Sequence, residues 1–418
     1  MSIYDNAGVV LIPSGTKASK LYSVLPANGN GDFNATRGST ATRVNKDGLI
    51  ESVATNVPRL DYPLIDGVVQ DCPALLLEPS RSNNLPYSEQ FDNSAWSKGN
   101  STVTANQAIS PDGSQTADLL QLTSAGGNVF DGVGGSGDYA FSVFAKYVDA
   151  QYIRLRSTSS YAYFDIQNGS VGSTINVSST KIEDYGNGWY RCTVVGNNTN
   201  SLTQIFVSDT DGSNTGTGSV YLWGAQFEAG SYPTSYIPTS GSTVTRSADV
   251  CNGSGTSAEF NDSEGVLFAE IAALADDLTF RSISISDGTT SNRISLSYIT
   301  TSNIASAYVN TTSGVAFSSS ITINNIAENN KFAVKYKSGD YSFWINGFET
   351  SSGSSSNIFA NGTLNTLTFD KGNGGDDMYS NTKQLMTFKT ALTDSELETL
   401  TSWDSFNAMA TGQLYTIE

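Results

Sequence analysis

The sequence predicts an all-β protein, in which an irregular N-terminal region precedes two antiparallel β-sandwiches and one short helix lies near the C-terminus. Three observations lead to this prediction. Apolar and polar residues alternate with period two in many short runs, and clusters of Gly, Asn and Asp separate these runs. Charged residues make up 15% of the 418 residues, below the roughly 25% of ordinary soluble domains. A helix-start motif followed by an apolar stripe stands out in ALTDSELETLTSW.

The first predicted region, residues 1–84, is rich in turns and poor in long alternating runs. NKDG at positions 45–48 favours a turn because Gly is its last residue. The run Ala74–Leu77 is typical of a short buried strand, and Pro79 ends it because proline has no amide hydrogen for a ladder. Such a segment is suited to wrapping over another domain or to docking onto a neighbouring protein.

The second region, residues 85–248, is predicted to be a sandwich. The runs YAFSVFAKY, WYRCTVV and VYLWGAQFE each place large apolar side chains on one face. In IRLR the alternation places Ile153 and Leu155 inward and Arg154 and Arg156 outward. Period two between turn clusters indicates antiparallel sheets that pack face to face.

The third region, residues 249–404, repeats this alternation with different sequences, starting at GVLFAEIAAL. In KFAVKYKSGDYSFWINGFE two alternating runs flank SGD, which predicts a hairpin. Across it, three residues of one run pair with three of the other: Phe332, Val334 and Tyr336 with Tyr341, Phe343 and Ile345. Residues 405–418 are expected to form an ordered arm.

The predicted helix lies in ALTDSELETLTSW. Thr393 and Glu396 have the spacing of a capping box, in which each side chain satisfies an amide at the helix start. Leu397 and Leu400 then give the helix an apolar stripe.

The stretch GSYPTSYIPTSG follows the last apolar run of the second region. Pro233 and Pro238 should end regular strand pairing there. Tyr232, Tyr236 and Ile237 are then free to lie back on the sandwich, so we expect a stiff, packed strap between the two sandwiches. The alternative is an exposed aromatic platform for sugar.

Composition excludes several classes of function. The net charge of −18, with 22 Lys and Arg residues and no basic run, argues against nucleic acid as a partner. The absence of histidine excludes Ser-His-Asp and Cys-His catalysis and histidine-ligated metals. Cys72, Cys192 and Cys251 are widely spaced, which argues against a zinc site or a disulfide framework and favours buried, reduced thiols.

The N-terminal sequence MSIYDNAGVVLIPSG has neither the cationic start of a signal peptide nor an apolar run long enough to span a bilayer. We therefore expect no membrane insertion, and assembly in a cytosol. A surface-like composition without an export signal fits a virus particle, which assembles inside a cell and acts outside it.

Several motifs resemble a known family. FNATRGSTATRVNKDGLIE, NNLPYSEQFDNSAWSKGN, KIEDYGNGWYRCTV and VYLWGAQFEAGSYPTSYIPTSGSTVTRSADV resemble segments of bacteriophage virion proteins of the head-spike and tail-fibre type, which carry a carbohydrate-binding-module-like sandwich. KFAVKYKSGDYSFWING and ALTDSELETL resemble the central hairpin and closing helix of a concanavalin-A-like or laminin-G-like lectin sandwich. Together these motifs extend over most of the chain.

The resemblance implies a fold and a role. The first sandwich, residues 85–248, should be jelly-roll-like and the second, residues 249–404, concanavalin-A-like. Residues 1–84 should attach a non-enzymatic fibre or spike to capsid, collar or tail proteins, and the sandwiches should bind host-surface glycans. The protein should be a homo-oligomer, often a trimer in such fibres, on the surface of a virion assembled in the host cytoplasm. Head and tail locations both stay open.

Two other classes remain. A polysaccharide depolymerase spike would need a groove that holds two carboxylates roughly 5 to 10 Å apart. A lectin-like module of a bacterial surface protein would need an export signal, which the sequence given does not show.

Candidate sites follow from local motifs. In DTDGSN, Asp209, Asp211 and Asn214 have the alternate oxygen ligands of a calcium loop but no distal Glu, and a plain β-turn is the alternative. Calcium is the only cofactor candidate.

For sugar, Trp344 points away from Phe343 on its strand, so an exposed second face would let it stack on a pyranose ring. Asn346 would supply hydrogen bonds, and Asp376 and Asp377 lie in a loop that touches calcium or sugar in lectin-like folds. Core packing of Trp344 and a solvated loop are the alternatives.

For attachment to the particle, Arg37, Arg43 and Arg59 are candidates to pair with acidic groups of a capsid or collar protein. Ordinary surface charge is the alternative.

Overall fold

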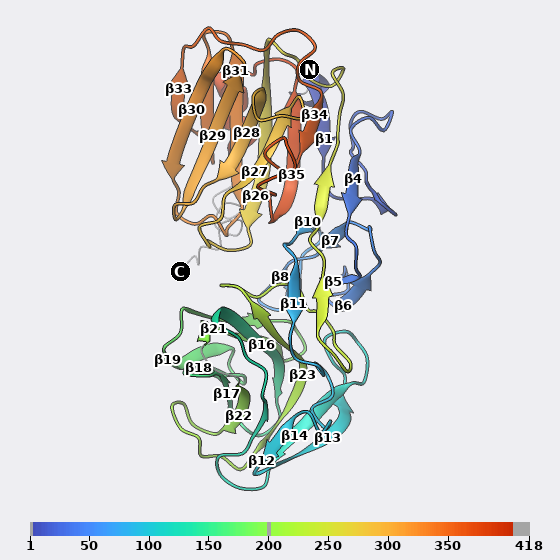
Figure 1. Cartoon of the computed structure of the whole chain (residues 1–418), viewed down its shortest axis with the longest axis vertical. Coiled ribbons are helices and arrows are strands. Elements are labelled where there is room, and N and C mark those ends of the chain that lie inside the picture. Colours follow the sequence, from blue (N-terminus) through green and yellow to red (C-terminus); the bar gives the residue numbers. More distant parts are fainter. Residues whose placement is uncertain (1–2, 199–201, 404–418) are drawn as a thin grey trace.

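The computed structural model describes residues 3–198 and 202–403, so the predicted arm over residues 405–418 lies outside the described residues. Two lobes are stacked along the long axis of the molecule (Figure 1). The upper lobe is the C-terminal sandwich, the lower lobe is the sandwich of the second region, and strands of the N-terminal region run beside and between them. The architecture is all-β with a single described α-helix, as the sequence predicts.

The lower sandwich consists of two six-stranded antiparallel sheets. The first, in spatial order, contains β12 (Ser97–Gly99), β15 (Asn128–Asp131), β22 (Thr203–Ser208), β17 (Tyr152–Ser157), β18 (Ser160–Asp165) and β19 (Ser170–Ile175). The second contains β13 (Ser101–Ala108), β14 (Ala117–Leu122), β23 (Ser219–Ala229), β16 (Gly137–Tyr147), β21 (Trp189–Asn198) and β20 (Ser179–Asp184). Inward residues such as Phe141, Ile153, Leu155 and Phe227 form one buried apolar core between the sheets, so the predicted alternation is confirmed.

The upper sandwich combines a large sheet with a five-stranded one. The large sheet runs through β33 (Phe348–Gly353), β32 (Tyr341–Ile345), β31 (Asn330–Lys337), β26 (Glu264–Ala273), β35 (Ser380–Phe388), β10 (Ala74–Leu77) and β7 (Arg59–Asp61), and β1 (Ala7–Leu11) also pairs with β35. The smaller sheet runs through β30 (Gly314–Thr322), β29 (Ile304–Thr311), β28 (Arg293–Tyr298), β27 (Arg281–Ser286) and β34 (Thr366–Thr368). Phe332 lies opposite Ile345 and Val334 opposite Phe343, which confirms the predicted hairpin.

Helix α1 (Asp394–Thr401) covers part of the outer face of the large sheet. Its N-terminus has the predicted capping box between Thr393 and Glu396. Leu397 and Leu400 are buried in an apolar cluster on that outer face, together with Trp344 and Met386. Among the described residues, no helix has the length and apolar character needed to cross a membrane.

The N-terminal region is not a separate unit. β1 and β10 both pair with β35, and β7 follows β10, so this region completes the large sheet of the upper lobe. Its remaining strands form small sheets with each other or with the segment that joins the lobes: β2 (Thr16–Lys17), β3 (Lys20–Leu21) and β4 (Phe33–Thr36) with β25 (Val250–Asn252); β5 (Ala41–Val44) with β6 (Ile50–Val53); β8 (Leu64–Ile65) with β9 (Val68–Val69); and β11 (Arg81–Asn83) with β24 (Val244–Arg246). The chain begins with the 3-10 helix η1 (Ile3–Asn6). The strand over Ala74–Leu77 therefore docks within its own chain.

A buried ion cluster joins the lobes at the level of β10. The Glu78 carboxylate pairs with Arg59 at 2.6 Å and with Arg246 at 2.7 Å. Asp249 pairs with Arg37 at 2.9 Å and also with Arg59. All five side chains are at most 6% exposed. Such a cluster is destabilising unless each charge is satisfied, and here every charge has a partner of opposite sign.

The arginines determine the ionisation of Glu78. Burial alone would raise the pKa of this carboxyl, but Arg246, Arg59 and hydrogen bonds from Ser235 lower it to about 2. Since the folded pKa lies below the ordinary value of 4.5, ionised Glu78 stabilises the fold above pH 4.5, and this stabilisation is lost as the pH falls towards 2.

The stretch GSYPTSYIPTSG forms the predicted packed strap between the two sandwiches. Tyr232, Tyr236 and Ile237 are 6%, 4% and 3% exposed, which excludes an exposed aromatic platform. No strand runs from Gly230 to Thr239, and side chains satisfy many of the backbone groups there. Ile237 N donates to Gln226 Oε1 at 2.6 Å, and the Tyr236 carbonyl accepts from Thr42 Oγ1 at 2.5 Å.

The cysteines match their prediction in part. Cys192 and Cys251 are buried free thiols, and burial raises the pKa of both. Cys72 is exposed, in the turn that precedes β10, so the prediction of a buried thiol is wrong for this residue.

We predict that the strap is anchored chiefly by the Tyr236 ring. This ring lies 4.6 Å from that of Trp223, and its hydroxyl contacts Ser88 at 2.6 Å and Glu89 at 2.8 Å. Tyr236→Ala should lower the free energy of unfolding by roughly 3–5 kcal/mol, because it leaves a large cavity. Tyr236→Phe should cost only about 1 kcal/mol, because it loses hydroxyl contacts alone. Urea unfolding measures both, and equal losses would contradict the packing account.

Candidate functional site

A groove lies between the two lobes, and strands of the N-terminal region form part of its wall. It consists of two adjoining cavities of about 560 and 780 Å³. Both are lined by Asp61, Lys181, Ala327 and Asn381, so they are continuous. Binding sites often occur at such interfaces between domains, and each cavity is in the size range of small-ligand sites. The groove is therefore the candidate functional site.

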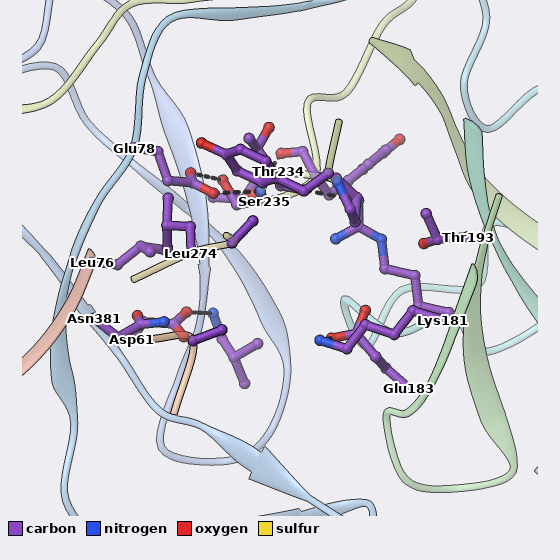
Figure 2. A pocket seen from close by; sticks show the side chains of 18 of the residues that line it. Asp61, Leu76, Glu78, Lys181, Glu183, Thr193, Thr234, Ser235, Leu274 and Asn381 are labelled. Atoms are coloured by element: carbon purple, nitrogen blue, oxygen red, sulfur yellow. Dashed lines mark hydrogen bonds and ion pairs between the residues drawn. The ribbon is translucent and has the colours of Figure 1, made fainter. Parts of the chain in front are cut away.

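The first cavity lies between the outer face of β20 and β21 and the N-terminal strands. Leu76, Glu78 and Asp61 lie on one wall, and Lys181, Glu183 and Thr193 lie on the other (Figure 2). Side chains alternate between the two faces of a strand, and Cys192 and Val194, the neighbours of Thr193, point into the core. Thr193 therefore points outward, to the wall of the cavity.

The charges of this wall are arranged around Glu183. Lys181 Nζ lies 2.7 Å from the Glu183 carboxylate. Burial alone would raise the pKa of Glu183, but Lys181 and Arg191 outweigh this effect and lower it. Arg191 is itself held by hydrogen bonds to Ser142 Oγ at 3.1 Å and to the Thr234 carbonyl of the strap at 2.8 Å. The wall thus carries an ionised carboxylate near a guanidinium that hydrogen bonds hold in place.

Asp61, on the opposite wall, has a different ionisation. Burial raises its pKa to about 6, although a hydrogen bond from Val44 N and the charge of Arg59 act to lower it. The Val44 amide donates to Asp61 Oδ1 at 2.7 Å. One groove therefore holds a carboxyl that titrates near pH 6 and another that stays ionised.

The second cavity opens over the end of the large upper sheet. Lys331, Glu270 and Gln384 lie side by side on β31, β26 and β35 and line this cavity. Lys331 Nζ lies 4.7 Å from the centre of the Trp403 ring and donates to the Ser402 carbonyl at 3.0 Å. An indole ring among amide, ammonium and carboxylate groups provides stacking and hydrogen bonds together.

The predicted sugar residues lie outside the groove. Trp344 is 6% exposed under helix α1, and its indole Nε1 donates to Ser342 Oγ at 3.0 Å. Trp344 is therefore packed in a core, which was the alternative to sugar stacking, because the helix and its leucines cover that side of the sheet. Asn346 holds the hairpin turn, where its side chain accepts from Lys331 N and donates to Asn330 Oδ1, both at 2.9 Å.

The carboxylates of the predicted lectin-type loop are engaged locally. Asp376 pairs with Lys371 at 2.8 Å. Asp377 accepts from the Tyr379 hydroxyl at 3.1 Å, and burial raises its pKa. Neither residue lines the groove.

The DTDGSN loop has the geometry of a hydrogen-bonded turn. Asp211 accepts from Ser173 N and Oγ, both at 2.8 Å, and Asp209 accepts from Thr217 N at 3.2 Å. Asn214 accepts from the Tyr163 hydroxyl at 2.8 Å. Within residues 3–198 and 202–403, no group of three or more Asp, Glu, Cys or His side chains is placed to hold a metal ion.

The three attachment candidates lie in different environments. Arg37 and Arg59 belong to the buried ion cluster, so they are not exposed contacts for another protein. This corrects the expectation, and the reason is that Glu78 and Asp249 draw both side chains inward. Arg43 pairs with Glu51 at 2.6 Å with its side chain 24% exposed, and it lines the first cavity.

Sequence patterns did not indicate the groove. Asp61, Lys181, Lys331 and Trp403 come from all three predicted regions, and only the fold brings them together. The local signal was confined to KIED, where Lys181 and Glu183 alternate with Ile182 and so share one face of their strand.

Comparisons with known proteins identify no family. The chain matches no protein-family model and no curated protein. Similar solved structures include the carbohydrate-binding module CBM40 of Ruminococcus gnavus IT-sialidase bound to α2,3 sialyllactose (13% identity, TM-score 0.30, 34% of this chain and 84% of that one). Others are domains LG4-5 of the mouse laminin α1 chain (9%, TM-score 0.25, 81% and 96%) and the CBM22-1–CBM22-2 tandem domain of Paenibacillus barcinonensis Xyn10C (11%, TM-score 0.23, 79% and 94%). At these values the neighbours carry no argument about the groove.

We predict that Asp61 makes stability fall as the pH rises towards neutrality. The pKa of Asp61 in the folded protein is about 6, above the ordinary value of 3.8. Its contribution to the free energy of unfolding is therefore complete below pH 3.8 and is lost as the pH rises through 6. The slope contributed by one proton is at most about 1.4 kcal/mol per pH unit. Urea unfolding between pH 4 and 7 measures it, and Asp61→Asn should flatten the curve. An unchanged curve in the variant would contradict the assignment.

Proposed function

We propose that this protein is a non-enzymatic adhesin that binds surface glycans in the groove between its lobes. The observation that carries the proposal is the composition of the groove walls. Lys331, Gln384 and Asn381 supply amide and ammonium donors, Glu270 supplies an acceptor, and Trp403 supplies a ring. Sugars are recognised by such combinations, because their hydroxyls need donors and acceptors while their C–H faces stack on aromatic rings.

A groove of constant width requires that the two lobes are rigidly connected. The ion cluster and the strap provide this connection, since Ser235 of the strap donates to Glu78 at 2.7 Å through its amide and at 2.6 Å through its hydroxyl. A preformed groove loses little conformational entropy when it binds a flexible glycan chain.

The resemblance to phage virion proteins supports placing this adhesin on a particle as part of a fibre or spike. In that setting capsid, collar or tail proteins are its partners, and several copies raise weak single-site binding by avidity. The buried positions of Arg37 and Arg59 leave other surfaces of the N-terminal region for attachment. A lectin module on a bacterial surface would use the same groove, and immunogold labelling of particles and host cells distinguishes the two.

A second candidate is a polysaccharide depolymerase. The specific observation in its favour is that Asp61 and Glu183 line one cavity with their pKa values shifted in opposite directions. A protonated and an ionised carboxyl are the general acid and the base or nucleophile of glycoside hydrolysis.

We predict binding without cleavage when the protein meets an array of bacterial capsular and lipopolysaccharide glycans. Lys331→Gln and Trp403→Ala should each weaken binding about tenfold, because each removes one charged or stacking contact. Lys337→Gln is the matched control, since Lys337 lies on the same strand and pairs with Glu264 outside the groove lining.

A reducing-end assay on the bound glycans separates the two candidates. No new reducing ends are expected. Their appearance, and its loss in Asp61→Asn and Glu183→Gln, would establish the depolymerase instead. If the protein bound none of the glycans, or bound them equally well in all variants, the groove would not be the adhesive site.

A further inference from the structure

The outer face of the first sheet in the lower sandwich carries a guanidinium among aromatic rings. Strand register places Asn128, Phe206, Arg154 and Tyr163 in one row across β15, β22, β17 and β18. Their sequence neighbours, such as Val129, Ile153 and Phe164, point into the apolar core. The row therefore lies on the side of the sheet away from the core, and away from the groove, which borders β20 and β21 of the other sheet.

Arg154 is held in place by three rings. Its guanidinium carbon lies 3.8 Å from the centre of the Phe206 ring, 5.0 Å from that of Tyr161 and 5.7 Å from that of Tyr163. Tyr163 is in turn fixed by its hydrogen bond to Asn214 of the 209–217 loop. Stacking of this kind orients the plane of the guanidinium and uses its faces rather than its N–H groups.

The charge of Arg154 has no carboxylate partner among the described residues. The residue is 6% exposed, its Nε has no hydrogen-bond partner in this part of the chain, and no ion pair involves it. Of the other buried arginines, Arg37, Arg59, Arg246 and Arg281 each pair with a carboxylate, and Arg191 donates to Ser142 Oγ and to the Thr234 carbonyl. The contacts of Arg154, by contrast, are with aromatic rings. A nearly buried cation without an anion is costly, which indicates that an anion completes this site.

The neighbouring row supplies neutral donors and a second cation. Gln204, Arg156 and Tyr161 lie side by side and half-buried. Arg156 is occupied by bonds to the Thr158 carbonyl at 2.6 Å and Gln204 Oε1 at 3.4 Å. On the far side of the central row, Asp165 accepts from Gln151 at 2.7 Å and from Asn168 at 2.9 Å, and it forms no ion pair with Arg154.

We propose that Arg154 is the centre of a second glycan site, which takes a sugar residue bearing a carboxylate. The planar guanidinium matches a carboxylate in two parallel hydrogen bonds, and Tyr161 and Tyr152 beside it are half-buried rings on which a pyranose can stack. In a chain of net charge −18, an acidic polysaccharide needs such a local cation to bind. This site is separate from the groove of the proposed function.

Binding of three acidic probes to the full chain tests the site: a glucuronate–N-acetylglucosamine hexasaccharide, an oligogalacturonate and sialyllactose, each compared with its carboxyl-reduced form. Intrinsic fluorescence titration should show that at least one acidic probe binds about tenfold or more tightly than its reduced form. Arg154→Gln should remove this preference, and added salt should weaken it. If Arg154→Gln does not fold, Tyr161→Ala tests the site through its stacking surface, because Tyr161 is only half-buried.

Matched controls distinguish this site from the groove. Lys181→Gln and Trp403→Ala alter groove residues and should leave the preference for carboxylate unchanged. Equal binding of acidic and reduced probes, no binding of any acidic probe, or full preference retained in both Arg154→Gln and Tyr161→Ala would overturn the proposal. A result in which groove variants alone lose binding would keep the proposed function and reject this second site.

Discussion

The pairing of three arginines with Glu78 and Asp249 is the interaction on which the rest of the structure depends. Arg59 belongs to the large upper sheet, Arg246 to the segment that joins the lobes, and Glu78 directly follows β10. The strap reaches the same carboxylate through Ser235, and Thr234 beside it accepts from Arg191 of the lower sandwich at 2.8 Å. A continuous set of buried polar contacts therefore runs from one sandwich to the other.

This cluster explains why the groove has a defined shape. Breaking one partner of a buried ion pair typically costs about 3–5 kcal/mol, since it leaves the other charge unsatisfied. The lobes are thus resistant to separation at the level of Glu78, while the cavity walls next to it remain polar. At Asp61 burial outweighs a nearby positive charge. This residue lies two positions from Arg59, yet its burial raises its pKa.

The two proposed glycan sites occupy opposite faces of the lower sandwich. One uses the outer face of β20 and β21 together with the upper lobe, and the other uses the outer face of β17, β18 and β22. A glycan-binding surface on each side suits a protein that contacts a polysaccharide layer rather than a single molecule, and weak sites then act together.

Features encoded by neighbouring residues could be predicted from the sequence. The hairpin around Gly339, the capping box at Thr393 and the packed strap depend on local spacing, turn residues and proline, and the structure has all three. The outward direction of Arg154 also followed from alternation alone. Trp344 was harder, because a strand has two faces and only the helix that follows it much later decides which are covered.

Features that depend on distant residues could not be predicted. Arg37 and Arg59 looked like surface charges, but their partner Asp249 lies 212 and 190 residues away in the sequence. The addition of β1 and β10 to β35 likewise has no local signal, since a short apolar strand can join any open edge. The groove depends on both of these long-range contacts, so it appears only when the chain is folded.

The most direct test of this account is the distance between the lobes in solution. Spin labels at Ser124→Cys and Ser354→Cys, both exposed and on different lobes, with Cys72→Ser to remove the exposed thiol, allow pulsed electron paramagnetic resonance to measure it. We predict one narrow distance distribution, which broadens in Asp249→Asn under conditions where circular dichroism shows both sandwiches folded, and stays narrow in the Lys337→Gln control. A broad distribution in the parent protein, or a narrow one in Asp249→Asn, would contradict the claim that the ion cluster holds the two lobes together.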